Sequence, residues 1–203
     1  ADTRIPFLIG GAYALEHYTG IARHPKDLDL FLTREDCSRA LAALAEAGFR
    51  TELTFSHWLG KAFAEGHFID LIFSSGNGLS VIDEGWFMHA TRGQLFEQPV
   101  RFSPPEEMIW SKAFIMERER YDGADVIHLL RACDLAWPRL LARFGPHWPV
   151  LLSHLILFGF VYPDQRHRVP DAVLRALLHR AQWELTAAPA NPALCHGTLL
   201  SLR

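Results

Sequence analysis

The stretch IPFLIGGAYALEHYTGIARHPKDLDLFL, residues 5–32, decides the fold. Its first residues are apolar and predict a strand, Gly10 and Gly11 follow, and AYALEHY predicts a short helix. KDLDLFL then predicts a second strand. Because successive side chains of a strand point to opposite faces, Asp27 and Asp29 share one face of it. The sequence therefore predicts two carboxylates in one small volume, shortly after a glycine turn.

Two carboxylates so close together repel each other, and either a bound cation or free solvation of that face relieves the repulsion. Mg²⁺ is a hard cation that prefers oxygen ligands of this kind. The glycine pair leaves the strand-to-helix turn without a Cβ, and the helix N-terminus offers N–H groups to a phosphate. Phosphates beside paired carboxylates and Mg²⁺ indicate phosphoryl or nucleotidyl transfer.

A third carboxylate, Asp70, lies in the apolar segment HFIDLIF. The apolar neighbours predict a strand buried on both sides, where an isolated ionised acid is costly and needs a partner. A metal bound to Asp27 and Asp29 would supply that partner. The longer segment LGKAFAEGHFIDLIF predicts two strands joined in a hairpin at Glu65 and Gly66.

At these residues the sequence resembles the nucleotidyltransferase superfamily, whose members share the DNA polymerase beta-like fold. The superfamily includes DNA polymerase beta, tRNA-terminal adenylating enzymes and antibiotic adenylyltransferases. Its pattern is an apolar strand, Gly-Gly or Gly-Ser, a short helix, two acids at alternate positions of a strand, and a third acid on a later strand. The resemblance covers roughly residues 5–73 and includes the glycine pair and all three acids.

Two features depart from the family pattern. Fifteen residues separate Gly11 from Asp27, which makes a slightly long connection. Pro25 stands where related bacterial proteins often carry Ser or Thr, although Arg23 keeps the arginine of that segment.

The resemblance implies that Asp27, Asp29 and Asp70 are the catalytic and metal-binding residues, holding two Mg²⁺ ions, with Mn²⁺ as an alternative. It implies transfer of a nucleoside monophosphate from ATP or another NTP to an acceptor hydroxyl, with release of pyrophosphate. Asp70 would serve as general base or as a ligand only. The glycine pair and Arg23 would contact the nucleotide.

A looser match extends into the following helices. Bacterial nucleotidyltransferase-like proteins carry a lysine near the start of the first of these helices and an Arg…Asp-x-x-Asp element in the second. Lys112, Arg120, Asp122 and Asp125 occupy these positions. The match implies a contact from Lys112 to the nucleotide. The alternatives are that the lysine extends its charge to solvent and that the two acids cap and pack a helix.

The fold class expected is α/β (α+β), a small mixed sheet flanked by helices and followed by a helical domain. Residues 1–103 form the predicted catalytic domain and residues 104–203 the predicted helical domain. Ser103 is the predicted N-cap of the first of these later helices, with Glu106 reaching back to it, and that helix is expected over residues 106–121.

Composition and charge limit the class of protein. The chain has 203 residues, of which 49% are hydrophobic and 21% are charged, as in an ordinary globular protein. The odd number and wide spacing of Cys37, Cys133 and Cys195 predict neither a disulfide framework nor a zinc site and favour the cytoplasm. The longest apolar run, residues 150–162, contains a histidine and is too short to span a bilayer, so no membrane partner is expected.

The formal net charge of −3 gives no support for an extended nucleic-acid surface. The partners expected are therefore an NTP and an acceptor that is a small molecule, a protein or a short RNA end held inside the cleft. The rival hypothesis is a catalytically silent nucleotide-binding or interaction module, such as a toxin–antitoxin component. A further alternative is a phosphohydrolase that uses the same acids with water as acceptor. Base preference and oligomeric state are left open.

Overall fold

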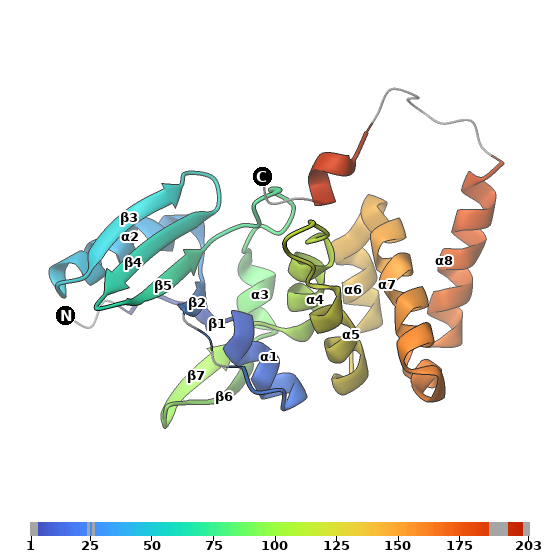
Figure 1. Cartoon of the computed structure of the whole chain (residues 1–203), viewed down its shortest axis with the longest axis horizontal. Coiled ribbons are helices and arrows are strands. Elements are labelled where there is room, and N and C mark those ends of the chain that lie inside the picture. The colour runs from blue at the N-terminus through green and yellow to red at the C-terminus, as the bar shows by residue number, and fades with distance from the viewer. Residues whose placement is uncertain (1–3, 24, 26, 187–194, 201–203) are drawn as a thin grey trace. The chain divides into compact units, whose positions relative to one another are not determined.

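The computed structural model describes residues 4–23, 25, 27–186 and 195–200 (Figure 1). The chain divides into two compact units, Ala1–Pro104 and Pro105–Arg203. The first unit is built on a β-sheet, and helices make up most of the second. Lys26, the first residue of the predicted second strand, lies outside the described residues.

The described part of the first unit contains one seven-stranded sheet with the order β3-β4-β5-β2-β1-β7-β6. Strand β2 runs parallel to β5 and β1 runs parallel to β7, whereas the other neighbouring pairs are antiparallel. The predicted mixed sheet is therefore confirmed. The strands are β1 (Leu8–Ile9), β2 (Asp27–Phe31), β3 (Arg50–Phe55), β4 (Leu59–Ala64), β5 (His67–Ile72), β6 (Thr91–Leu95) and β7 (Gln98–Phe102).

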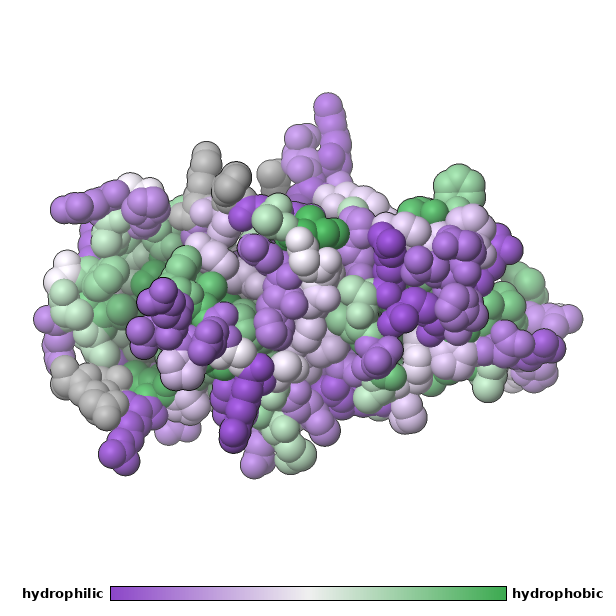
Figure 2. Space-filling view, turned by 90° about the horizontal axis from the view of Figure 1, so that it is seen from below, coloured by the Kyte–Doolittle hydropathy of each residue, from purple (hydrophilic) through white to green (hydrophobic). Residues whose placement is uncertain are grey.

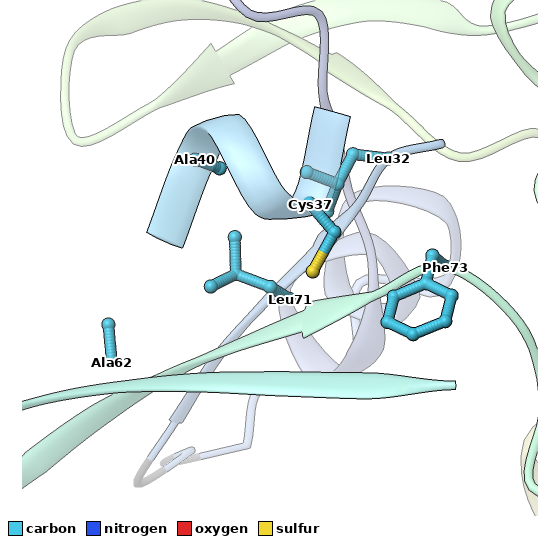
Figure 3. Close-up of a cluster of buried hydrophobic side chains, with 6 residues drawn as sticks. All are labelled: Leu32, Cys37, Ala40, Ala62, Leu71 and Phe73. Carbon is cyan, nitrogen blue, oxygen red and sulfur yellow. The ribbon is translucent and has the colours of Figure 1, made fainter. Parts of the chain in front are cut away.

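One face of the sheet is covered by a helix. The helices of the first unit are α1 (Gly11–Thr19), α2 (Arg34–Glu46) and α3 (Glu84–Met88). Helix α2 packs on β3 and β4 (Figure 1), and it begins where the Thr33 hydroxyl accepts a hydrogen bond from the Asp36 N–H at 3.2 Å. Figure 3 shows the core beneath α2, formed by Leu32, Cys37, Ala40, Ala62, Leu71 and Phe73.

The opposite face carries the acids. Leu30 of β2 and Ile69 of β5 pack against the core beneath α2. Because side chains alternate along a strand, Asp29 and Asp70 point away from that core. The sequence of β2 thus assigns its leucines to the core and its acids to the other face.

The β4–β5 hairpin fixes the register of this face. Glu65 and Gly66 form the predicted two-residue turn, with positive φ angles of 39° and 83°. Lys61 consequently lies opposite Asp70, and the parallel pairing of β2 with β5 places Asp29 on the other side of Asp70. Three ionisable side chains therefore form a row across adjacent strands.

The turn between β1 and α1 is closely packed against β2. The Gly10 N–H donates a hydrogen bond to the Asp29 carbonyl oxygen at 2.9 Å. A Cβ on Gly10 would lie 1.8 Å from the Phe31 ring, and a Cβ on Gly11 would lie 1.6 Å from Asp29 Oδ2. Gly11 also has a φ of +53°. The glycine pair is thus required by the side chains of the chain's own second strand.

The helices of the second unit are α4 (Pro105–Ala113), α5 (Gly123–Ala132), α6 (Trp137–Phe144), α7 (Trp148–Val161) and α8 (Asp171–Glu184). Ion pairs connect α4 to α6: Glu107 lies 2.6 Å from Arg139 and 3.1 Å from Arg143. Because a fully buried carboxylate without a partner is strongly destabilising, these arginines fix the packing of the two helices.

The side-chain capping contacts predicted for the start of α4 are wrong. The Ser103 hydroxyl is buried and has no hydrogen-bond partner. Glu106 does not reach back to it, since its carboxylate accepts a hydrogen bond from the Ala136 N–H at 2.6 Å and another from Arg139. An ion pair with a neighbouring helix has replaced the local capping interaction.

Helix α4 is also shorter than the predicted helix over residues 106–121, because it ends at Ala113. The chain then turns, and Met116 pairs with Tyr121 in an antiparallel bridge. Phe114, just after the helix, is buried and stacks on Phe144 of α6 with the ring centroids 5.8 Å apart. Tertiary packing of this ring overrides the local helical preference.

By length and composition alone, the helical run Trp137–Val161 is apolar enough to cross a membrane. The same test accepts the core helix of a globular protein. Leu151, His154 and Phe158 of α7 are buried within the second unit, as expected of a core helix.

His154 predicts a pH-dependent stability. It is buried, its Nε2 lies 2.9 Å from the Ala113 carbonyl oxygen, and burial lowers its pKa from 6.5. Below pH 6.5 the unfolded chain therefore binds a proton at His154 that the folded protein does not bind. The free energy of unfolding consequently falls as the pH falls. The slope from this group is at most about 1.4 kcal/mol per pH unit. Urea unfolding between pH 7 and 5 measures it.

The matched variant is His154→Gln, whose side-chain amide can donate to the same carbonyl but does not titrate. We expect a flatter stability profile than that of the unaltered chain over the same pH range. Parallel profiles for the two proteins would contradict the assignment.

The glycine turn generates a second prediction. Gly11→Ala forces a Cβ into the Asp29 carboxylate and keeps a left-handed backbone. Gly20→Ala is the control, since Gly20 has a φ of +70° but no atom within 4 Å of the position that a Cβ would take. We expect the control to lose about 1–2 kcal/mol from its backbone alone and Gly11→Ala to lose about 1–3 kcal/mol more. Equal losses in urea unfolding would disprove the close contact.

Candidate functional site

The three predicted acids meet on the face of the sheet opposite α2. One oxygen from each of Asp27, Asp29 and Asp70 lies within 4.8 Å of the others. Asp27 and Asp29 come from alternate positions of β2, and Asp70 is the direct partner of Asp29 on β5. All three side chains are partly exposed, so the cluster is accessible from solvent.

This cluster suits a hard divalent cation. It offers only carboxylate oxygens, which Mg²⁺ and Mn²⁺ prefer over the nitrogen and sulfur ligands of zinc sites. Three carboxylates at this separation also repel each other, and a bound cation would relieve that repulsion. The donor set and its spacing therefore fit the metal that the sequence predicts.

Lys61 is part of this site, although it was not among the residues predicted from the sequence. Its Nζ lies 2.6 Å from Asp70 Oδ1 and 4.3 Å from the centroid of the Phe68 ring. The signal was present in the predicted hairpin. A two-residue turn at Glu65 and Gly66 pairs the residues on either side of it, and counting outward from there places Lys61 opposite Asp70.

The N-terminus of α1 lies next to the acids. Gly10 is the N-cap residue and provides no side-chain cap, and Asp29 Oδ2 lies 1.6 Å from the position that a Cβ on Gly11 would take. A helix N-terminus carries N–H groups and a partial positive charge that suit a phosphate. The expected contact of the glycine pair with a nucleotide phosphate remains a prediction.

A cavity of about 300 Å³ opens at the beginning of β2 and β5. Asp27 is the one member of the acid cluster that lines it, together with mostly apolar side chains such as Tyr13, Phe49 and Phe68. In the view of Figure 2, hydrophobic residues gather at the end of the first unit that carries β3, β4 and β5. The surface beside the acids is therefore suited to an apolar or planar group.

Two further nucleotide contacts were predicted from the sequence, at Arg23 and Lys112. Arg23 is exposed in the connection between α1 and β2. Lys112 belongs to the second unit, where its Nζ lies 3.0 Å from Asp122 and 2.9 Å from Asp125. A contact from either residue to a nucleotide remains a prediction.

Asp122 stands at the N-cap position of α5 but makes no side-chain cap hydrogen bond. Its carboxylate instead accepts hydrogen bonds from Lys112 and Arg120. Burial alone would raise the pKa of Asp122, but these two cations outweigh burial and lower it. The expected helix cap is thus replaced by an ion-pair network inside the second unit.

No protein-family model and no curated protein sequence matches the chain. Among solved structures, the antibiotic-resistance factor ANT(2'')-Ia is similar, with a TM-score of 0.50, 19% identity, and coverage of 74% of this chain and 87% of that one. An antigenic nucleotidyltransferase-like protein from Paracoccidioides brasiliensis gives a TM-score of 0.49 at 19% identity, covering 80% of this chain and 83% of that chain. The lincosamide antibiotic adenylyltransferase LnuA gives 0.44 at 12% identity, with 63% and 87% covered.

At 19% identity, the likeness to ANT(2'')-Ia establishes the fold. The expectation is confirmed at that level: the chain shares the fold of ANT(2'')-Ia, with a mixed sheet and flanking helices.

Proposed function

We propose that this chain is a metal-dependent nucleotidyltransferase. It transfers a nucleoside monophosphate from an NTP such as ATP to the hydroxyl of an acceptor, and pyrophosphate leaves. The observation that carries the proposal is the meeting of Asp27, Asp29 and Asp70 within 4.8 Å on the face of the sheet opposite α2, beside the N-terminus of α1. The reaction needs a site for divalent cations and a site for the phosphates, and we assign these roles to the acid cluster and to the N-terminus of α1.

The acid cluster and the helix N-terminus have different roles in this proposal. Asp27, Asp29 and Asp70 hold the divalent cations, and Mg²⁺ bound there supplies positive charge for the triphosphate and the acceptor oxygen. Asp29, in contact with Gly11, connects the cation site to the helix end that receives the phosphates.

The transfer itself is an in-line displacement. The acceptor oxygen forms a bond to the α-phosphorus while the bond from this phosphorus to the bridging oxygen of pyrophosphate breaks. Asp70 lies on the β4–β5 side of the cluster, and its carboxylate accepts the proton of the acceptor hydroxyl in this proposal.

The acceptor we favour is a small molecule or a protein side chain. The net charge of −3 does not suit an extended nucleic acid, and ANT(2'')-Ia, whose fold is shared, is an antibiotic-resistance factor. The reaction takes place in the cytoplasm in this proposal, which agrees with three cysteines that are all free thiols.

Asp70→Asn tests the proposal, because it keeps the shape of the side chain and removes its charge and basicity. We expect transfer to fall about 10²–10⁴-fold. The measurement incubates the protein with Mg²⁺ and each α-³²P-labelled NTP in a cell lysate, which is then separated into small-molecule, protein and RNA fractions. Label in one of these fractions identifies the acceptor class.

Glu46→Gln is the matched control, since Glu46 is an exposed acid at the end of α2. It should transfer label at the rate of the unaltered chain. Binding of NTP without label in any fraction would instead identify a silent nucleotide-binding module. Release of labelled nucleotide to water alone would identify a phosphohydrolase.

A further inference from the structure

We propose that Lys61 is a positioning residue of this site, an inference that rests on the proposed function. Its ammonium holds the Asp70 carboxylate in the acid cluster when no divalent cation is bound, and it competes with that cation for Asp70. Lys61 is therefore the internal counter-ion of the cluster and lowers its affinity for metal.

The pairing of the strands places this ammonium. Glu52 of β3 lies opposite Lys61 of β4, Lys61 lies opposite Asp70 of β5, and Asp70 lies opposite Asp29 of β2. The four side chains form a row across four neighbouring strands. Opposite charges directly across a strand pair attract, and like charges repel. Lys61 is the cation of this row, between Glu52 and the two aspartates.

Two contacts hold Lys61 in that position. Its Nζ lies 2.6 Å from Asp70 Oδ1, and the side chains of Lys61 and Asp70 are only 21% and 13% exposed. The same Nζ lies 4.3 Å from the centroid of the Phe68 ring. A carboxylate and an aromatic face together stabilise a partly desolvated ammonium more than either does alone. Lys61 thus differs from a lysine whose charge extends freely into solvent.

Electrostatics explains why the cluster holds a cation of its own. Asp70 lies within 4.8 Å of two further carboxylates, and their repulsion opposes the arrangement. The ammonium offsets part of that repulsion. A divalent cation at the same oxygens is repelled by the ammonium at this short range, so its binding must weaken or break the Lys61–Asp70 pair.

Lys61→Met tests the competition, because methionine keeps an unbranched apolar chain over Phe68 and carries no charge. The probe is Mn²⁺ without nucleotide, titrated at low ionic strength, with free Mn²⁺ measured by electron paramagnetic resonance. We expect Lys61→Met to bind Mn²⁺ about three- to tenfold more tightly, the factor that corresponds to a partly buried ion pair. Lys61→Arg should restore the original affinity.

Arg50→Met is the matched control. Arg50 lies over the Phe63 ring at 3.9 Å and pairs with Glu52 on the same face of the sheet, but it does not contact the acid cluster. Its Mn²⁺ affinity should equal that of the unaltered chain. In an Asp70→Asn background, Lys61→Met should no longer tighten binding.

A second readout is the unfolding temperature, which in the absence of metal does not depend on Mn²⁺ affinity. Without metal, Lys61→Met should unfold at a lower temperature than the unaltered chain, and added Mn²⁺ should raise its unfolding temperature more than that of the unaltered chain.

Equal or weaker Mn²⁺ binding by Lys61→Met, with the unaltered chain binding normally, overturns the role of Lys61 and leaves the proposed function standing. Absence of Mn²⁺ binding in the unaltered chain overturns the proposed metal site itself.

Discussion

The repulsion among three carboxylates is the constraint on which the first unit depends. Asp27, Asp29 and Asp70 approach within 4.8 Å of each other because β2 and β5 pair in one particular register. A shift of β2 by one residue in that register would turn Asp27 and Asp29 toward the core beneath α2 and away from Asp70. The leucines that pack under α2 thus hold the acids together on the opposite face, and the stability of the core maintains an electrostatically unfavourable cluster.

The glycine pair links the cluster to the rest of the fold. Gly10 and Gly11 are closely approached by Phe31 and Asp29, so the first helix can begin only where β2 allows it. The same contact brings a carboxylate to a helix N-terminus, where negative charge is stabilised. The close contact with Asp29 requires glycine at position 11, and the same contact places the acid cluster beside the helix N-terminus.

Much of the first unit could be predicted from sequence, because its signals are local. Alternation in DLDLF separates acids from leucines, the Glu65–Gly66 turn defines a hairpin, and Thr33 caps α2. The second unit was less predictable. Glu106 and Asp122 stand at helix starts, yet each binds a distant cation, Arg139 or Lys112, that local propensity does not reveal. These ion pairs depend on the packing of whole helices.

Lys61 is a residue of the site that was not predicted from the sequence. Its role depends on a cross-strand partner nine positions away, which becomes visible only when the hairpin register is counted outward from the turn. Residues that repeat a family pattern were identified, whereas a residue defined by register alone was not. The site in this chain is accordingly a cross-strand row with one cation, Lys61, as well as a group of three acids.

The most direct test of the proposed metal site is to locate where a divalent cation binds. Mn²⁺ added to ¹⁵N-labelled protein broadens the amide signals of residues close to it. We predict that broadening begins at residues 27–29, 69–71 and 10–12, which surround the acid cluster, and that Asp29→Asn abolishes it. Broadening centred on another part of the chain, or no effect at all, would contradict this prediction.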